Sequence, residues 1–377
     1  MNELSPGAAL TRKLVGFQTI NPPGNERACV EFLAEELSKL GFETACHDFG
    51  SDRANLVARL PATAGPARKP LVFSGHVDTV PLGHALWSVP PFDGLVKDGR
   101  IYGRGTSDMK SGVAAFVAAA RALAELPERH ADIVHVISAA EETGSEGVAW
   151  LAERPELLGE CGALVVAEPT DNRPMIGHKG ALWMEIAASG VTAHGSMPDK
   201  GVNAVVRAAR LVSDLAGFDF GIAPHPVMGA PTLNIGTIAG GMNVNSVPDH
   251  AVVGVDVRTV SGQTNAAVRD QIAAAVGDDV AIELVVDMEP VFTDPDDPWI
   301  QQVFAVAERV AGRVPKAETA TYFTDGSILK AAYGHPPTVI MGPGPMHMAH
   351  QTDEYCELSR IDACVAAFTE IASEYVA

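Results

Sequence analysis

Short apolar runs that alternate with helical segments constrain the fold of this 377-residue chain more than any other feature of its sequence. Runs at 70–80, 133–139 and 163–166 are rich in Val, Ile and Leu, which is typical of buried strands. Helices are predicted at 27–40, where apolar residues recur at helical spacing, and at 109–126, which is rich in Ala and free of Pro. Strands that alternate with helices predict a mostly parallel sheet covered by helices on both faces. We therefore predict an α/β fold for this part of the chain.

A different pattern begins near Gly177 and predicts a second, smaller domain. Its predicted elements follow one another as strand 181–190, helix 201–216, strands 232–240 and 251–259, helix 264–276 and strand 280–287. This order is typical of a ferredoxin-like α+β layer. Later helices then resume the first pattern, at 299–312 and 359–375. We predict an α/β domain in two parts with a second domain inserted between them, the three segments being 1–176, 177–291 and 292–377.

Composition excludes several classes of partner. The formal net charge is −20 and Lys and Arg form no basic run, so neither nucleic acid nor an anionic membrane surface is expected as a partner. No apolar stretch approaches the roughly 18 residues of a membrane span. The five cysteines are scattered without a Cys-x-x-Cys pair, which argues against a disulfide framework and against a thiolate zinc site. No export signal is visible in residues 1–12, and we expect a cytoplasmic protein.

Acidic residues and one histidine gather where predicted strands and loops end. The set comprises His76, Asp78, Asp108, Glu141, Glu142 and Glu168. The carboxyl ends of parallel strands form the ligand crevice of an α/β sheet, so these side chains are expected at one rim. Close carboxylates raise one another's pKa unless a cation neutralises them, and no run of Lys or Arg lies nearby. A divalent metal is therefore predicted, with zinc as the first choice for His and carboxylate ligands and cobalt or manganese as substitutes.

Five short motifs resemble the signatures of one enzyme family. GHVDTVP at 75–81, YGRGTSDMKSG at 102–112 and EETGSEG at 141–147 resemble its first three signatures, and EPT at 168–170 and AHQTDE at 349–354 complete the set. The motifs stand in the family's order, and the resemblance extends from about residue 10 to the C-terminus. The family contains two-zinc deacylases and exopeptidases such as acetylornithine deacetylase, succinyl-diaminopimelate desuccinylase, carboxypeptidase G and aminoacylase. The resemblance implies a zinc-dependent hydrolase of linear amide bonds, with a mostly parallel-sheet catalytic domain and an inserted domain for dimerisation and closure as a lid.

The resemblance also implies two zinc ions per subunit and a role for each motif residue. The implied metal ligands are Asp108 as the bridge, His76 and Glu168 at one ion, and Glu142 and His350 at the other. Asp78 would hold the ring of His76 so that its other nitrogen faces the metal. Glu141 would be the general base, which takes a proton from a zinc-bound water as that water attacks the amide, and passes it to the departing amine. His347 lies three residues before His350 and remains a rival ligand.

The inserted domain carries a second group of candidate residues. In the resembled family this domain pairs two subunits, so a homodimer is implied, and His194 would reach the neighbour's active site to steady the carbonyl oxygen. Arg258 would bind a substrate carboxylate, with Asn245 beside it. Without the resemblance, His194 would be interpreted as a solvated loop residue and Arg258 as part of an interface salt bridge. Gly326 and Ser327 fall where the family contacts the substrate backbone.

Two sequence details bear on the substrate. Glu rather than Asp at position 168 resembles the acylase and carboxypeptidase side of the family, and 178–180 lacks the Arg pair that desuccinylases carry there. The expected small-molecule substrate is therefore an N-acyl-L-amino acid with a free α-carboxylate, cleaved as by acetylornithine deacetylase. A dipeptidase or glutamate carboxypeptidase-like enzyme and a succinyl-diaminopimelate desuccinylase are the alternatives within the family. A one-metal hydrolase and a catalytically silent dimeric binding protein are the alternatives outside this mechanism.

Overall fold

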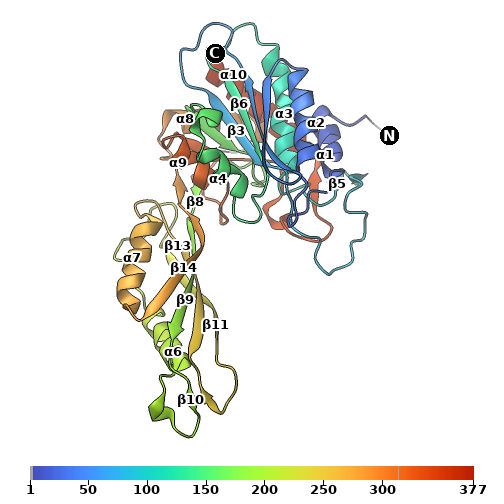
Figure 1. The fold of residues 1–377 in the computed structure, drawn as a ribbon. Coiled ribbons are helices and arrows are strands. Elements are labelled where there is room, and N and C mark those ends of the chain that lie inside the picture. Colours follow the sequence, from blue (N-terminus) through green and yellow to red (C-terminus); the bar gives the residue numbers. More distant parts are fainter. Residues whose placement is uncertain (1–2, 313) are drawn as a thin grey trace. The chain divides into compact units, whose positions relative to one another are not determined.

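The computed structural model describes residues 3–312 and 314–377, which divide into two compact units (Figure 1). The larger unit comprises the chain up to Gly177 together with Phe292–Ala320 and Thr324–Ala377. The smaller unit comprises His178–Val291 and Thr321–Phe323. Residues 321–323 belong to the smaller unit because the Phe323 ring packs edge-to-face on Trp183, with ring centroids 6.2 Å apart. The smaller unit is thus inserted into the larger one.

The larger unit is built on a mostly parallel sheet. Within the described residues this sheet has six strands, in the order β1 (Glu43–Gly50), β2 (Arg53–Leu60), β6 (Ile133–Ser138), β3 (Leu71–His76), β7 (Ala163–Val166) and β16 (Thr338–Ile340). From β6 to β16 all neighbours are parallel, whereas β1 and β2 form an antiparallel edge. The strands β3, β6 and β7 are buried along their whole length, as expected for a sheet covered on both faces. The predicted fold class is confirmed.

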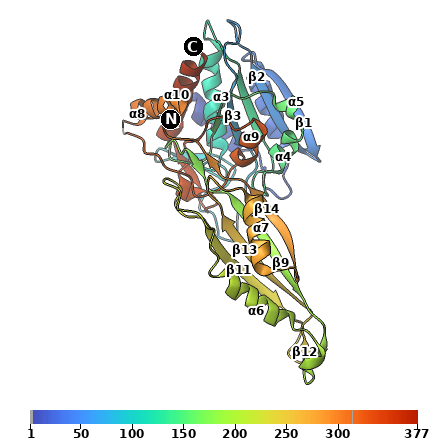
Figure 2. The same ribbon diagram turned by 90° about the vertical axis from the view of Figure 1, so that its left-hand side faces the viewer.

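Helices cover both faces of this sheet, as the two ribbon views together show (Figures 1 and 2). They are α1 (Pro6–Val15), α2 (Arg27–Ser38), α3 (Lys110–Ala124), α4 (Glu146–Ala152), α5 (Pro155–Leu158), α8 (Pro298–Ala311), α9 (Gly326–Ala332) and α10 (Leu358–Val376). The aromatic core lies between β3, α3 and α10, where the Phe73 ring contacts Phe116 and Phe368 at centroid distances of 5.9 and 5.3 Å. Burial of these large rings contributes much of the stability of the unit.

Shorter strands form two further small sheets. They are β4 (Leu95–Lys97), β5 (Arg100–Tyr102) and β17 (Tyr355–Glu357) in a three-stranded sheet, and β8 (Gly177–His178) paired with β15 (Val291–Phe292). Strand β17 runs antiparallel to β5, with Tyr355 opposite Tyr102. This pairing brings the segment before Tyr355 alongside the loop that follows Tyr102, and both segments carry motif residues.

The smaller unit has the ferredoxin-like order of elements. Its sheet is antiparallel, in the order β11 (Thr232–Gly240), β13 (His250–Arg258), β9 (Ala181–Ser189) and β14 (Val280–Met288). Helices α6 (Ala204–Leu215) and α7 (Asn265–Val276) follow β9 and β13, and each is capped at its N-terminus, by Asn203 and Thr264 respectively. Their apolar faces pack on one face of the sheet around Ile186 and Val255. A two-stranded antiparallel sheet of β10 (Ala193–His194) and β12 (Ser246–Val247) and a 3₁₀ turn at Pro198–Lys200 extend this unit.

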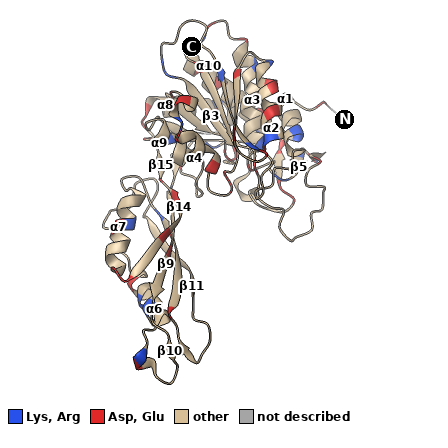
Figure 3. Ribbon diagram, in the orientation of Figure 1, with Lys and Arg blue, Asp and Glu red and all other residues tan. Residues whose placement is uncertain are grey.

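Charged residues are spread over both units. Figure 3 shows Asp and Glu on helices and strands throughout, with Lys and Arg interspersed among them. This distribution agrees with the formal net charge of −20. None of the described helices combines the length and the apolar character needed to cross a membrane.

Candidate metal centre

The ends of three adjacent parallel strands position the candidate ligands. His76 is the last residue of β3, Glu142 lies four residues beyond β6, and Glu168 lies two residues beyond β7. The order β6, β3, β7 in the sheet therefore brings these side chains to one edge. Asp108 joins them from the loop just before α3. These placements follow from the strand pattern that the sequence already predicts.

At two glycines the backbone packs directly against the backbone of another segment, and these contacts hold the Asp108 loop and α3 in place. A Cβ at Gly112, in the first turn of α3, would lie 2.0 Å from the carbonyl oxygen of Ala167, directly before Glu168. A Cβ at Gly344 would lie 2.2 Å from the carbonyl oxygen of Ser107, directly before Asp108. Only glycine fits at both positions, because real Cβ atoms do not approach carbonyl oxygens so closely. The glycines thus let ligand-bearing segments come together.

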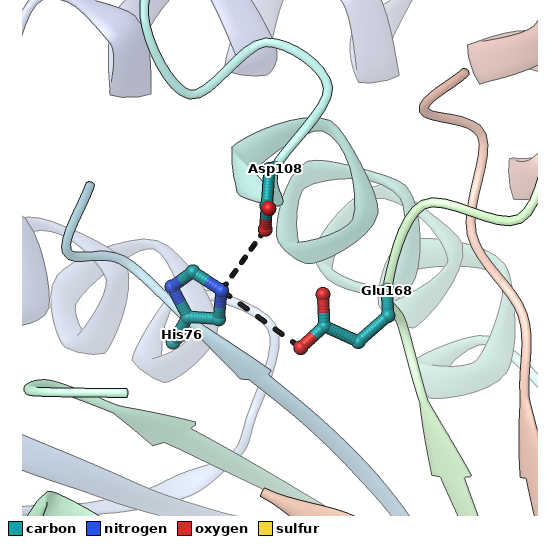
Figure 4. Close-up of side chains that lie close together, drawn as sticks. All are labelled: His76, Asp108 and Glu168. Carbon is teal, nitrogen blue, oxygen red and sulfur yellow. Dashed lines mark hydrogen bonds and ion pairs between the residues drawn. The ribbon is translucent and has the colours of Figure 1, made fainter. Parts of the chain in front are cut away.

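The side chains form two groups that share Asp108. His76, Asp108 and Glu168 offer ligand atoms within 4.8 Å of one another, and so do Asp108, Glu142 and His350. In the first group, His76 Nε2 lies 3.2 Å from Asp108 Oδ1 and 3.8 Å from Glu168 Oε1 (Figure 4). In the second, His350 Nε2 lies 3.5 Å from Asp108 Oδ2 and 3.1 Å from Glu142 Oε2. Because the two oxygens of Asp108 face different groups, the arrangement suits two ions bridged by one carboxylate.

Glu141 lies beside the first group and outside both. Its Oε2 is 4.0 Å from His76 Nε2, and its side chain is buried. The adjacent Glu142 belongs to the second group, so these two neighbouring carboxylates are expected to have different roles. A carboxylate close to a metal site without being one of its ligands has the position of a general base.

Asp78 holds three parts of the centre at once. The Nδ1 of His76 lies 3.0 Å from the backbone carbonyl of Asp78 and 3.4 Å from its Oδ1, so the backbone carbonyl is the nearer acceptor. The same carboxylate accepts hydrogen bonds from the backbone N–H groups of Glu141 and Glu142, both at 3.1 Å. Asn21 Nδ2 donates to it at 2.9 Å. Asp78 therefore orients the ring of His76 and also fixes the backbone of the Glu141–Glu142 pair.

The charges of the centre are unbalanced without a cation. Burial raises the pKa of Glu141 and Glu168 well above the usual carboxyl range, and burial with the charge of Asp108 also raises the pKa of Glu142. Burial alone would lower the pKa of His76, but its carboxylate neighbours outweigh burial and raise that pKa well above its ordinary value. The protein would thus have to retain protons here, in the absence of a positive ion, to offset repulsion between carboxylates.

One buried oxygen tests directly whether a metal fits. Glu142 Oε1 is buried and has no hydrogen-bond partner among the described residues, although Oε2 of the same side chain contacts His350. A buried carboxylate oxygen without a partner is costly unless a cation meets it. The donors are imidazole nitrogens and carboxylate oxygens, which suit zinc and also cobalt or manganese. The residues present fit two divalent ions.

His347 does not join either group. Its Nε2 lies 3.5 Å from the hydroxyl of Tyr355, and the two rings contact each other with centroids 6.3 Å apart. The ligand groups found among the described residues contain His350 and omit His347. His350 itself has a positive φ of 63°, which turns the chain so that its imidazole, and not that of His347, faces Glu142.

The candidate residues of the smaller unit occupy two separate places. His194 is on β10, where its Nδ1 lies 2.7 Å from the hydroxyl of Ser196, and the backbone of Asn245 pairs with Gly195 at 2.7 Å. Arg258 is the last residue of β13, a strand that begins only after Asn245. At about 3.3 Å per residue, the nine-residue strand separates Asn245 from Arg258 by about 25 Å or more within one chain. The expectation that Asn245 lies beside Arg258 is wrong for a single chain.

Arg258 already has partners within its own unit. Its Nε lies 2.9 Å from Asp256 Oδ1, and its Nη2 donates to Asp256 Oδ2 at 3.1 Å. The guanidinium lies 5.8 Å from the centre of the Trp183 ring. Asp256 and Arg258 are two residues apart on one strand and so share a face of the sheet.

Gly326 and Ser327 begin α9 and are buried. Both of their N–H groups turn back to Thr324, the Gly326 N–H to its hydroxyl and the Ser327 N–H to its carbonyl, each at 3.0 Å. The neighbouring Asp325 accepts a hydrogen bond from Ser138, the last residue of β6. This bond ties the start of α9 to the same strand that leads to Glu141.

A comparison with models of protein families identifies the family of the chain. The model of peptidase family M20/M25/M40 matches residues 72–374. The chain belongs to this family. The family assignment confirms the resemblance on which the two-zinc hydrolase prediction was based. This M20 chain is a hydrolase of amide bonds, as its homologues are.

Curated M20 relatives match almost the whole chain. A probable succinyl-diaminopimelate desuccinylase of Staphylococcus epidermidis is 29% identical, over 97% of both chains. An acetylornithine deacetylase of Proteus mirabilis is also 29% identical, over 90% of this chain and 87% of its own length. The predicted class of enzyme is confirmed by this family membership, whereas the two relatives differ in their named substrates.

Solved M20 structures share the fold. An M20 metallo-carboxypeptidase from Sulfolobus solfataricus has a TM-score of 0.80 at 18% identity, covering 100% of this chain and 99% of its own. The YXEP protein of Bacillus subtilis, described as a dinuclear metal-binding peptidase, has a TM-score of 0.72 at 16% identity, covering 98% of this chain and 97% of its own. At these identities the likeness concerns the fold alone.

Three buried residues of the M20 centre were missed by the sequence prediction. Asn21 contacts Asp78, and Arg104 and Glu354 contact each other beside the Asp108 loop. Arg104 lies in the motif at 102–112 and Glu354 in the motif at 349–354, so the motifs could have drawn attention to them. No sequence pattern, however, distinguishes a residue that supports a ligand from the ligand itself. Asn21 lies outside every motif, 57 residues before its partner.

Proposed function

We propose that this M20 chain is a metal-dependent amidohydrolase that removes the acyl group from an N-acyl-L-amino acid, as acetylornithine deacetylase does. The observation that carries the proposal is the pair of ligand groups sharing Asp108, with the buried carboxylate of Glu141 beside them. The relative from Proteus mirabilis, named acetylornithine deacetylase, supports this choice of substrate class. The absence of the Arg pair that desuccinylases carry also supports this choice. In its place are His178, which is buried, and Lys179, which donates to the carbonyl of Ala230.

Two divalent ions per subunit, zinc with cobalt or manganese as substitutes, are the proposed cofactors. Asp108 would bridge them, His76 and Glu168 would complete one site, and Glu142 and His350 the other. When bound, the ions would lower the pKa of water and polarise the amide carbonyl. Asp78 would keep the ring of His76 in one tautomer, since its backbone carbonyl accepts the Nδ1 proton.

Glu141 is the proposed general base. Its side chain is buried, and burial raises its pKa, which favours the capture of a proton from the attacking water. Its backbone N–H donates to Asp78, which fixes the backbone from which the carboxylate side chain extends. The same carboxylic acid would then pass the proton to the departing amine, which must leave protonated at neutral pH.

The smaller unit is proposed to form a homodimer and to complete the substrate site. Its edge strand β11 exposes Ile238, and α6 exposes Val205 and Val206, a combination that suits pairing with a second copy. His194 would then steady the carbonyl oxygen in the partner's site, with Asn245 close by, since its backbone carbonyl accepts from the N–H of Gly195. Sedimentation analysis of the purified enzyme tests the dimer.

Arg258, Gly326 and Ser327 are the proposed substrate contacts. Arg258 would bind the α-carboxylate through the donors that Asp256 leaves free. Gly326 and Ser327 would contact the substrate backbone near the end of β6. Location in the cytoplasm stays a prediction.

Removal of metal and of Glu141 tests the mechanism. Chelation is expected to abolish hydrolysis of N-acetyl amino acids, and added zinc or cobalt to restore it. Glu141→Gln is expected to bind the same amount of metal as the wild type but to lose about 10²–10⁴-fold in kcat. The matched control is Glu146→Gln, because Glu146 lies five residues on and is exposed. Hydrolysis at the wild-type rate by the metal-free enzyme or by Glu141→Gln would refute the mechanism.

A desuccinylase is the second candidate, because the relative from Staphylococcus epidermidis matches 97% of the chain. The carboxypeptidase fold of the Sulfolobus structure keeps dipeptide cleavage as a further alternative. A panel of N-acetyl, N-succinyl, N-formyl and N-carbamoyl amino acids and of dipeptides, assayed with saturating zinc, separates them. The highest kcat/KM on an N-acetyl amino acid is the expected result, and a higher value on N-succinyl substrates or dipeptides would assign the chain to the corresponding alternative.

A further inference from the structure

A buried ion pair lies behind the candidate metal centre. The carboxylate of Glu354 is fully buried, and Arg104 Nη1 donates to its Oε2 at 2.7 Å. The Arg104 side chain is 2% exposed, so both charges are withdrawn from water. Burying two charges costs free energy that their mutual attraction offsets only when the remaining hydrogen-bonding groups are also satisfied.

The carboxylate of Glu354 satisfies this condition by binding backbone. Its Oε2 accepts from the N–H of Gly105 at 3.0 Å, and its Oε1 accepts from the N–H groups of Ser107 and Asp108 at 2.7 and 3.0 Å. Four donors therefore surround one carboxylate. Three of them belong to the short loop that ends at Asp108, the ligand common to both groups.

Arg104 ties two further segments to the same point. Its Nη1 also donates to the carbonyl of Gln351 at 3.2 Å, and its Nη2 to the carbonyl of Pro81 at 3.1 Å. Gln351 directly follows the ligand His350, and Pro81 lies five residues after the ligand His76. The ion pair thus joins the loops that carry Asp108 and His350 to the chain that follows β3.

The two ligand groups depend on this pair to different degrees. In the group of Asp108, Glu142 and His350, two of the three ligands lie on segments that the pair holds directly. In the other group only Asp108 does, because His76 is the last residue of β3 and Glu168 follows β7 at once. His350 also depends on the pair more than His76 does, since His350 is half exposed and lies in a loop.

We propose that the Arg104–Glu354 pair positions the second group, Asp108, Glu142 and His350, and so determines its metal affinity more strongly than that of the first group. The proposal rests on the proposed two-metal function. Glu354 acts through the backbone N–H groups that orient Asp108, and Arg104 acts through the chain next to His350. Neither residue is a metal ligand.

Cobalt titration of the metal-free full-length enzyme tests this proposal through its visible absorption. The wild type is expected to bind two Co²⁺ per subunit. Glu354→Gln keeps the shape of the side chain but loses an acceptor oxygen, and is expected to weaken the second binding step about 10–100-fold while the first changes less than about threefold. At one equivalent its spectrum is expected to match that of His350→Ala, which lacks a ligand of the second group only. Combining the two substitutions is expected to cost no further affinity at the first step.

Glu357→Gln is the matched control. Glu357 lies three residues away at the end of β17 and also pairs with arginines, Arg360 at 3.2 Å and Arg100 at 3.9 Å, neither of which belongs to a loop that carries a ligand. Its titration is expected to follow that of the wild type. If Glu354→Gln does not fold, as circular dichroism would show, Arg104→Lys replaces it, and the same selective weakening of the second step is expected.

The possible outcomes separate two kinds of failure. If Glu354→Gln binds both ions as the wild type does, or loses both equally, the positioning role is refuted and the two-metal function stands. If the wild type itself binds fewer than two ions per subunit, the proposed function fails and the positioning role fails with it. Selective loss of the second step, without the same loss in Glu357→Gln, supports the proposal.

Discussion

Replacing His135 provides the sharpest test of the physical chemistry of the larger unit. His135 lies on β6, fully buried, and its ring contacts Phe42, Phe73 and Phe116 at centroid distances of 5.0, 5.7 and 4.8 Å. Neither ring nitrogen has a hydrogen-bond partner among the described residues. Burial among aromatic rings disfavours the charged imidazolium and lowers the pKa of His135 to about 3. The folded protein therefore holds this histidine neutral across the physiological range.

The shift in pKa sets the size and the sign of the effect. In the unfolded chain His135 titrates near 6.5, so between about pH 6.5 and pH 3 the unfolded state binds a proton that the folded state does not. Stability must then fall as the pH falls through this window. Linkage gives a loss of about 2 kcal/mol at pH 5 relative to pH 7.5, and of about 4 kcal/mol at pH 3.

Urea unfolding of the wild type, His135→Phe and His135→Leu measures this loss. Chelator is present throughout, so that release of metal does not contribute to the pH dependence. The difference in unfolding free energy between wild type and variant is expected to shift against the wild type by about 2 kcal/mol between pH 7.5 and pH 5. The shift must be equal for Phe and Leu, because it belongs to the wild-type imidazole, whereas packing changes only the offset at pH 7.5. A difference that does not vary with pH would refute a neutral, unpaired His135.

Two further substitutions test the support of the centre. Asn21→Ala removes a donor to Asp78 and is expected to lower kcat about 10–100-fold with metal content unchanged, as measured by steady-state kinetics with saturating zinc; an unchanged kcat would remove Asn21 from the centre. Gly112→Ala would place a Cβ 2.0 Å from the carbonyl of Ala167 and is expected to destabilise the fold by about 3 kcal/mol in urea unfolding, whereas Gly217→Ala, which meets nothing within 4 Å, is expected to be close to neutral. Equal stability of the two alanine variants would contradict the close approach.

The main architecture and the ligand positions could be predicted from the sequence because both follow from short-range patterns. The buried strands β3, β6 and β7 appear as continuous apolar runs, and the polar residues directly after them meet wherever parallel strands lie side by side. The edge strand β1 was not predicted, because its side chains are largely exposed and provide no apolar run. The assignment of individual roles needed the family resemblance, since position at a strand end does not separate Glu141 from Glu142.

The remaining errors concern relations that sequence spacing does not determine. The family resemblance implied that Asn245 lies beside Arg258. Arg258 is the last residue of the nine-residue strand β13, whereas Asn245 precedes its first residue, so the length of the strand lies between them within one chain. Likewise, 57 residues separate Asn21 from Asp78, and 250 separate Arg104 from Glu354. Only the folded chain shows that these pairs meet.

The buried carboxylates of the centre fall into two classes once their hydrogen bonds are known. The carboxylates of Asp78 and Glu354 accept hydrogen bonds from several N–H donors, most of them from the backbone. Among the residues that the structure describes, Glu142 has a buried oxygen without a hydrogen-bond partner, and the two oxygens of Asp108 each face a histidine. The second class offers the oxygens that would face a cation, and the first class fixes the backbone that carries them. Acidic residues counted along a sequence cannot be divided in this way, because the division depends on which backbone N–H groups the fold turns toward each carboxylate.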